Sequence, residues 1–282
     1  MQEIRLSARD GYALAATLFE PATPNGRAAM VCAAAGVPRG YYAKYAAYLA
    51  ERGFAALTFD YRGIGGSRPA RLRGYRAQMR DWVHHDIGGA LDFLAARFPE
   101  HSLSAIGQSF GGQALGAVEG NQRIASALLV ASQSGYWRHW RGVGRTGMFV
   151  VTHTLLPLGS RALGYFPASA FGMGEDLPAG VAIEWARWCR TPDYLVGDLG
   201  DEVRQRYRRY AGRILAYNFT DDRYAPLPAL QALMALYAGA EKEIRRIAPA
   251  DIAASRIGHF GFFREQFREP LWRPSADWLA AG

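Results

Sequence analysis

Lysine, cysteine and long apolar runs are all scarce in this chain of 282 residues. Cys32 and Cys189 are the only cysteines, so a framework of disulfides is excluded. Lys44 and Lys242 are the only lysines, and the net charge of +8 therefore comes from arginines spread along the chain. The longest apolar run, 148–158, is interrupted by polar residues and is too short to cross a bilayer. Because the first residues also lack the pattern of a signal peptide, we expect a cytoplasmic protein without an integral membrane segment.

Signals for a cofactor, a metal or a nucleic acid are also missing. The arginines accompany no nucleic-acid recognition motif, so we expect no nucleic-acid partner. The glycines within 63–66 follow an apolar run, but they lack the spacing and the lysine of a phosphate-binding loop. His84, His85 and Asp86 have no second cluster that would complete a metal site, and we interpret them as a solvated helix face. We therefore expect neither cofactor nor metal.

The chain contains instead a regular alternation of apolar runs and amphipathic segments. Turn residues at 10–11 between two alternating stretches predict an N-terminal hairpin. Alternation of strands and helices predicts an α/β fold, with a mostly parallel sheet and helices on both faces. The expected strands are 3–7, 13–20, 28–34, 54–59, a run ending near 106, 124–131, 214–219 and 244–248, and the expected helices are 42–52, 79–97, 110–120, 227–238 and 261–281.

One long stretch interrupts this alternation. No strand pattern is visible between 131 and 214, although a plain crossover needs far fewer residues. We expect 1–135 and 211–282 to form one core and 136–210 to be an inserted, mostly helical cap over the strand ends. The alternative is a helical decoration on the side of the sheet. Four tryptophans in the insertion are candidates for substrate contact, although aromatic residues more often form a core: Trp137, Trp140, Trp185 and Trp188.

A nucleophile motif lies where a strand is expected to meet a helix. Residues 107–111 read Gly-Gln-Ser-Phe-Gly, which is the G-x-S-x-G pattern in its required context. The two glycines leave room for a sharp turn that lifts Ser109 above the strand ends. With 32 glycines in the chain, the motif alone is only moderate evidence, and a base and an acid must follow.

Such partners follow two later strands. Asp221 and Asp222 come after the strand expected at 214–219, and His259 comes in the loop after the last strand. Since parallel strands end at one edge of a sheet, Ser109, one of the two aspartates and His259 are expected to meet there. The order serine, aspartate, histidine is that of an α/β-hydrolase triad.

Over nearly its full length the chain resembles an α/β-hydrolase-fold protein, and more narrowly the serine-aminopeptidase-like branch of that superfamily. The stretches that carry the resemblance are 59–67, 106–112, 222–226 and 257–263. The resemblance implies that Ser109 is the nucleophile and His259 its base. It favours Asp222 over Asp221 as the acid, because the acid of the family typically precedes a proline by four residues, here Pro226.

An oxyanion intermediate requires two backbone donors. One is the amide of Phe110, directly after the nucleophile. The other is expected from Gly36 or Val37, in the loop after the strand at 28–34. At that loop the sequence departs from the family, since Ala35-Gly36 stands where a His-Gly pair is common.

These observations predict a serine hydrolase whose substrate is a small molecule, an ester or thioester of a fairly apolar acyl group. A homodimer is possible on the sequence. Three alternatives remain. The same triad serves an acyltransferase. It also serves an aminopeptidase for small peptides, in which Glu175, Asp176 or Glu184 would bind the substrate amine. A non-catalytic binding module is the third alternative, although no triad member is missing.

Overall fold

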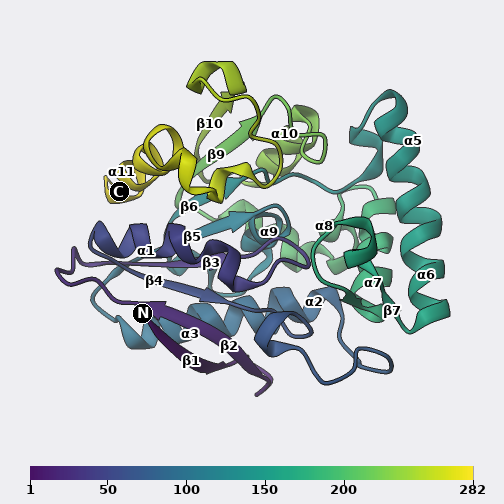
Figure 1. Ribbon diagram of the computed structural model, residues 1–282, viewed down its shortest axis with the longest axis horizontal. Helices are drawn as coiled ribbons and strands as arrows, with labels where there is room; N and C mark the ends of the chain where they lie inside the picture. The colour runs from purple at the N-terminus through teal and green to yellow at the C-terminus, as the bar shows by residue number, and fades with distance from the viewer. Residues whose placement is uncertain (282) are drawn as a thin grey trace.

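A single eight-stranded sheet forms the centre of the computed structural model, which describes residues 1–281 (Figure 1). The strand order is β1-β2-β4-β3-β5-β6-β9-β10. Only β2 runs against its neighbours, and all pairs from β4 to β10 are parallel. The strands are β1 (Gln2–Ser7), β2 (Ala13–Phe19), β3 (Arg27–Cys32), β4 (Phe54–Phe59), β5 (Ser102–Gln108), β6 (Ile124–Val130), β9 (Arg213–Phe219) and β10 (Glu241–Ile247). The expected mostly parallel α/β sheet is confirmed.

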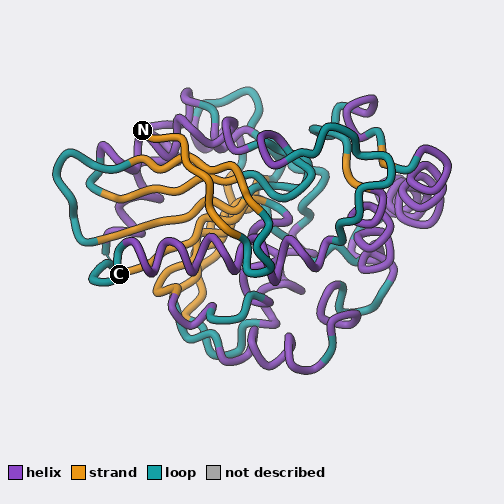
Figure 2. The backbone as a smooth tube through the Cα atoms, turned by 90° about the horizontal axis from the view of Figure 1, so that it is seen from below, coloured by secondary structure: helices purple, strands orange, loops and turns teal. Residues whose placement is uncertain are grey.

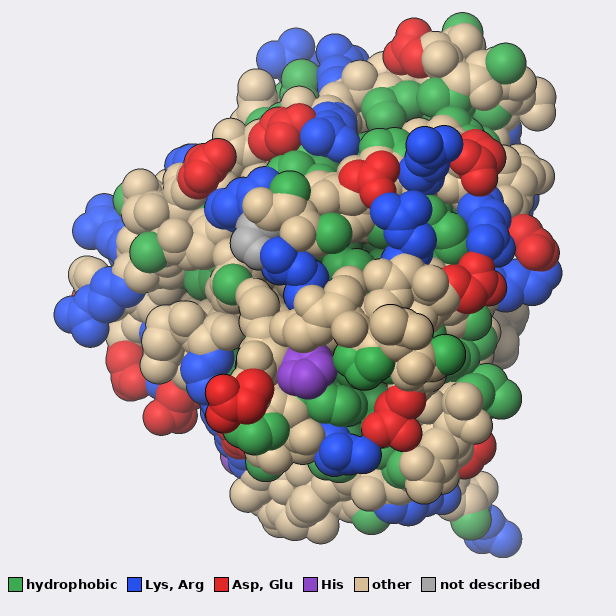
Figure 3. All heavy atoms as spheres, turned by 90° about the vertical axis from the view of Figure 1, so that its left-hand side faces the viewer, with side chains coloured by type: hydrophobic (Ala, Val, Ile, Leu, Met, Phe, Trp, Pro, Cys, Tyr) green, Lys and Arg blue, Asp and Glu red, His purple; other side chains and the backbone are tan. Residues whose placement is uncertain are grey.

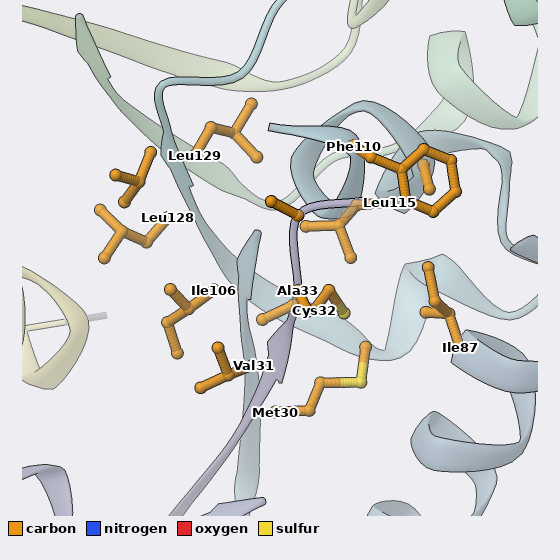
Figure 4. Close-up of a cluster of buried hydrophobic side chains, with 14 of the residues drawn as sticks. Met30, Val31, Cys32, Ala33, Ile87, Ile106, Phe110, Leu115, Leu128 and Leu129 are labelled. Carbon is orange, nitrogen blue, oxygen red and sulfur yellow. The ribbon is translucent and has the colours of Figure 1, made fainter. Parts of the chain in front are cut away.

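The inner strands are apolar on both faces because helices cover both sides of the sheet. Every residue of β4 is buried, and β3 and β5 are buried except for their first residue. Small and branched side chains of β3, β5 and β6 pack against Ile87, Phe110 and Leu115 of the neighbouring helices (Figure 4). β10 differs from the inner strands: it reads Glu-Lys-Glu-Ile-Arg-Arg-Ile and is mostly exposed. It is the last strand of the sheet, where charged side chains protect an edge from unwanted pairing with another strand.

The helices of the core are α1 (Ala43–Glu51), α2 (Met79–Asp81), α3 (Gly88–Arg97), α4 (Phe110–Ala114), α10 (Leu227–Leu236) and α11 (Arg273–Ala280). A π-helical segment, Trp82–Ile87, joins α2 to α3, so the helix expected over 79–97 is present as one continuous rod. α1 packs on the π-helical segment Arg268–Trp272 that leads into α11, and the rings of Tyr45 and Trp272 lie 5.4 Å apart. In the part of the chain that the structure describes, no helix combines the length and apolar character of a membrane span.

The prediction of a helix over 261–281 is wrong for the first residues of that range. Two short 3-10 turns, Gly261–Phe263 and Glu265–Phe267, replace the first two turns of that helix. Phe262 and Phe263 are adjacent and both buried, against the rings of Tyr45 and Tyr42. Both rings pack on tyrosines of a distant segment, so the backbone here follows tertiary aromatic packing and not the helical pattern.

A buried ion-pair cluster fixes the turn after β4. The Arg62 guanidinium donates to Asp86 in the π-helical segment and to Asp10 in the first hairpin. Asp86 is fully buried, so the interpretation of His84, His85 and Asp86 as a solvated helix face is wrong for Asp86. Asp86 lies on the buried side of the π-helical segment together with Trp82 and Val83, whereas the two histidines remain partly exposed.

The long connection between β6 and β9 is helical except for a two-stranded hairpin. It comprises α5 (Gly142–Val150), a π-helical segment (Val151–Leu155), α6 (Leu156–Leu163), β7 (Tyr165–Phe166), β8 (Leu177–Pro178), α7 (Ala179–Arg190), α8 (Leu195–Leu199) and α9 (Asp201–Arg209). In Figure 1, α5 and α6 stand at the right-hand edge, beside α7 and away from the sheet.

Candidate active site

Ser109 stands at a sharp turn between β5 and α4. Its backbone has φ +48° and ψ −115°, a conformation that costs energy for a residue with a side chain. A Cβ atom at Gly111 would lie 2.0 Å from the carbonyl oxygen of Cys32, and one at Gly107 would lie 2.4 Å from Gly112. Both motif glycines are therefore required by close backbone approach on either side of Ser109.

His259 is paired with Asp222. Its Nδ1 atom lies 2.8 Å from Oδ2 of Asp222, and both side chains are buried. Asp222 follows β9, and its other oxygen accepts the backbone N–H groups of Tyr224 (2.8 Å) and Ala225 (3.2 Å). The carboxylate is thus held by its own loop, with one oxygen left for the imidazole.

Asp221 has a different set of partners from its neighbour. Its carboxylate accepts the N–H of Ile257 at 2.9 Å and that of Gly258 at 3.0 Å. These two residues directly precede His259 in the chain. Asp221 therefore anchors the loop that carries the histidine, whereas Asp222 contacts the imidazole itself.

Gln108, the residue before Ser109, connects the loops around the site. Its Nε2 donates to the carbonyl oxygen of His259 at 2.9 Å, and its Oε1 accepts the hydroxyl of Tyr42 at 2.6 Å. The Tyr42 oxygen in turn accepts the amide N–H of Ala34 at 2.8 Å. Sequence reasoning missed both residues, because Gln108 occupies a motif position that admits any residue and Tyr42 is an ordinary helix-start aromatic.

A cavity of about 200 Å³ opens beside Ser109 and His259. Its wall is mostly apolar and includes no Asp, Glu, Lys or Arg side chain among the residues that the structure describes. Residues from the β6–β9 connection supply much of this wall. The lining residues there are Trp140, Met148, Val151, Thr152, Leu156, Phe166, Ala168, Gly172, Met173, Leu177, Trp185 and Cys189.

The four tryptophans proposed as substrate contacts divide into two pairs. Trp140 and Trp185 line the cavity. Trp188 is fully buried in helix packing, and its indole N–H donates to Asp198. Trp137 lies outside the cavity wall, where its ring packs on Phe149. Spacing alone could not separate Trp185 from Trp188, because both sit on α7 and only the packing of that helix decides which one faces the cavity.

The loop after β3 approaches the cavity through different residues from those expected. Val37 was expected as an oxyanion donor, but its N–H donates to the carbonyl of Ala34 at 3.1 Å. Gly36 and Val37 lie outside the cavity wall, whereas Ala34 and Ala35 form part of it. The loop makes a tight turn at Gly36, with φ +76°, and this turn brings the alanines to the cavity. The amide of Phe110 is the first of α4, where backbone N–H groups have no partner within the helix.

The acidic residues considered for binding an amine all lie away from the cavity. Glu184 is buried and pairs with Arg80 and Arg187. Glu175 accepts the amide of Gly65, and Asp176 accepts the hydroxyl of Ser169. Each carboxylate therefore has a partner in the fold.

Gln133 is a polar residue of the cavity wall that the sequence did not single out. It follows β6, is 7% exposed, and its Oε1 has no hydrogen-bond partner within residues 1–281. Gln113, on α4, also lines the cavity, and its Oε1 accepts the hydroxyl of Tyr194 at 2.8 Å. An unsatisfied buried amide costs free energy unless a ligand or water supplies the missing bond, so Gln133 is a candidate for substrate contact.

Comparison with known proteins identifies the architecture. The family model of the serine aminopeptidases, S33, matches residues 27–158. None of the curated proteins matches the chain. Among solved structures, an esterase of Pyrococcus furiosus is 14% identical with a TM-score of 0.66, covering 99% of this chain and 90% of its own. A second is Est1E of Butyrivibrio proteoclasticus with bound ferulic acid, at 15% identity, TM-score 0.64 and coverages of 99% and 98%. A monoacylglycerol lipase of Paleococcus ferrophilus is 15% identical, with a TM-score of 0.63 and coverages of 95% and 98%. At these identities the likeness shows a shared fold.

Proposed function

We propose that this chain, which shares its fold with known esterases and matches the serine aminopeptidase model over residues 27–158, is a serine hydrolase that forms an acyl-enzyme on Ser109. The observation that carries the proposal is the hydrogen bond between His259 and Asp222 beside a cavity that Ser109 and His259 both line. A serine at a strained strand–helix turn, a histidine and a buried carboxylate in this arrangement supply a nucleophile, a base and an orienting acid.

The chemistry follows from the positions of the donors and acceptors. Nδ1–H of His259 donates to Asp222, so Nε2 is free to take the proton of the Ser109 hydroxyl as the oxygen attacks the acyl carbon. Nε2 then gives this proton to the leaving alcohol or thiol. A water molecule, deprotonated by the same nitrogen, releases the acid and restores Ser109.

For the oxyanion we assign the amides of Phe110 and Ala35. Phe110 supplies the first N–H of α4, at the positive end of that helix. Ala35 replaces Val37 in this role, because Ala35 lies in the cavity wall and its N–H donates to no other group within the described chain.

The cavity wall supports an apolar acyl group as the substrate. Its side chains are mainly alanine, leucine, methionine, phenylalanine and tryptophan, and His259 is its only titratable nitrogen base within residues 1–281. An aminopeptidase needs a carboxylate for the substrate amine, and none of the residues considered for that role reaches the wall. We propose that 136–210 serves as a cap, since its residues supply much of the wall of the cavity that Ser109 lines.

Labelling with a fluorophosphonate probe tests the nucleophile. We expect stoichiometric labelling of the wild type and its loss in both Ser109→Ala and His259→Ala. Cys189→Ala is the matched control, because this thiol also lines the cavity; burial raises the pKa of Cys189, so the thiol stays protonated and labelling persists. A panel of p-nitrophenyl esters and acyl thioesters, with product analysis in the presence of an added alcohol, separates hydrolysis from acyl transfer. A folded wild type that neither labels nor turns over any ester refutes the proposal.

A further inference from the structure

Helices α5 and α6 present apolar side chains to solvent. They form one continuous rod with the π-helical segment between them, and no residue of α5 is buried. Val143 is 90% exposed and Leu158 is 57% exposed. We call this region the α5–α6 surface; its exposed large apolar residues are Val143, Phe149, Val150, Leu155, Leu158 and Leu163.

The same surface carries arginines without acidic partners. The chain contains no Asp or Glu between Glu119 and Glu175, although it has 25 acidic residues in total. The exposed arginines of the region are Arg138, Arg141, Arg145 and Arg161. Within residues 1–281 none of these four makes an ion pair, whereas about half of the other arginines do. On the opposite side of the molecule, basic and acidic side chains are mixed (Figure 3).

The surface lies on the outer side of a helix whose inner side lines the cavity. Met148, Val151 and Leu156 line the cavity, whereas Val143 and Val150, seven residues apart, share a solvent-facing side of α5. In Figures 1 and 2 this rod stands at the edge of the molecule. It is therefore accessible along its length without movement of the sheet.

We propose that the α5–α6 surface binds the face of an anionic lipid bilayer. A helix with exposed Phe, Leu and Val side chains, flanked by arginine, is the pattern of an interfacial helix. Trp137, whose ring lies 5.3 Å from the Arg138 guanidinium carbon and 5.0 Å from that of Arg145, is the residue type that settles at the headgroup level.

A bilayer fits this surface better than a protein partner does. The apolar side chains project from a helical rod at the edge of the molecule, and a bilayer adapts to such a convex surface. The unpaired arginines complement a layer of negative headgroups whatever their exact positions, and each arginine near such a layer favours binding. A consequence that rests on the proposed function is that an ester dissolved in the bilayer would lie next to the outer wall of the cavity.

Sedimentation with vesicles tests the proposal on the full chain. We expect binding to vesicles of phosphatidylcholine with about one-third phosphatidylserine, weakening as salt is raised, and little binding to phosphatidylcholine alone. Arg141→Gln/Arg145→Gln should weaken binding about thirty-fold, the fold-change for roughly 2 kcal/mol. Val143→Ser/Val150→Ser should weaken it about tenfold, because apolar area is lost from the lipid contact.

A matched charge control is available on α9. Arg208 and Arg209 are exposed and make no ion pair in the described chain, and α9 presents no exposed large apolar side chain. Arg208→Gln/Arg209→Gln removes the same charge and should change binding less than about threefold. If the two double variants lost vesicle binding equally, net charge alone would explain the binding, and the proposal would be overturned.

Two further outcomes also overturn it. One is equal or absent binding to both kinds of vesicle. The other is a concentration-dependent dimer that Val143→Ser/Val150→Ser abolishes, without vesicle binding, which would assign the surface to a second copy of the chain. Repeating the assay with Ser109→Ala keeps the result independent of hydrolysis, so failure of the proposed function and failure of this inference are distinguishable.

Discussion

Asp221 and Asp222 allow a paired test, because the same substitution in neighbouring residues should give opposite results. In Asp222→Asn, the oxygen that accepts the amides of Tyr224 and Ala225 can be retained. The new amide NH₂ then takes the place of Oδ2 and faces Nδ1 of His259. An NH₂ group only donates, so it requires Nδ1 to be unprotonated and places the proton on Nε2, the nitrogen that must accept the proton of Ser109.

The expected magnitude follows from this tautomer change. With the wrong tautomer and no negative charge to stabilise the imidazolium, kcat/KM for a p-nitrophenyl ester should fall about 10⁴-fold, or about 5 kcal/mol of transition-state stabilisation. The melting temperature should change little, because the loop bonds of Asp222 remain.

Asp221→Asn should behave in the reverse way. Its carboxylate accepts amides of Ile257 and Gly258 through both oxygens, and asparagine can accept through only one. Losing one charge-assisted bond should cost about 2 kcal/mol of unfolding free energy, or about 4–8 °C in melting temperature. Activity should stay within about tenfold of the wild type. If Asp221→Asn lost activity as severely as Asp222→Asn without unfolding, the assignment of Asp222 as the acid would be refuted.

Three further substitutions test other parts of the structure. Gly111→Ala places a Cβ 2.0 Å from the carbonyl of Cys32, so denaturant titration should show a loss of about 3 kcal/mol or more; a stable variant would contradict the close approach. Gln133→Leu should lower kcat/KM about tenfold for an acyl group that carries a hydroxyl or carbonyl, while its plain analogue is unaffected; equal effects on both would exclude substrate contact by Gln133. The Arg62 guanidinium lowers the pKa of Asp10 to about 2, from 3.8 unfolded, so Asp10 stabilises the fold above pH 4 and that contribution is lost as the pH falls towards 2. Melting curves of Asp10→Asn should therefore converge with those of the wild type over this window, and a constant difference would contradict the coupling.

The inner strands of the sheet could be predicted from the sequence because they are buried on both faces. The run 54–59 is short and continuously apolar, which is typical of a strand buried on both faces, and the structure places β4 on those residues. Prediction was weaker where tertiary packing decides the local form. At Gly261–Phe263 and Glu265–Phe267 the chain forms 3-10 turns where two phenylalanines pack on tyrosines of a distant segment, and sequence periodicity carries no information on such partners.

The candidate site divides along the same line. Chain order after the strands was enough to predict that Ser109, an aspartate and His259 lie at one edge, because parallel strands dictate it. Which of two adjacent aspartates meets the imidazole depends on a turn of the loop by one residue, and which residues of the loop after β3 line the cavity depends on the turn at Gly36. The proline four residues after Asp222 favoured that aspartate, and the structure pairs it with His259. No residue pattern indicated how the loop turns at Gly36, because backbone geometry and not residue type decides it.

Gln108 connects the loop that carries His259 to the loop after β3. Its carboxamide contacts the carbonyl of His259 on one side and, through Tyr42, the amide of Ala34 on the other. The base and the loop that we assign to the oxyanion are therefore both positioned relative to β5, the strand that ends at Ser109. A leucine of similar size would leave the buried carbonyl of His259 without this donor and the Tyr42 hydroxyl hydrogen without an acceptor. The motif position that tolerates any residue in general is therefore constrained here by the two loops that it joins.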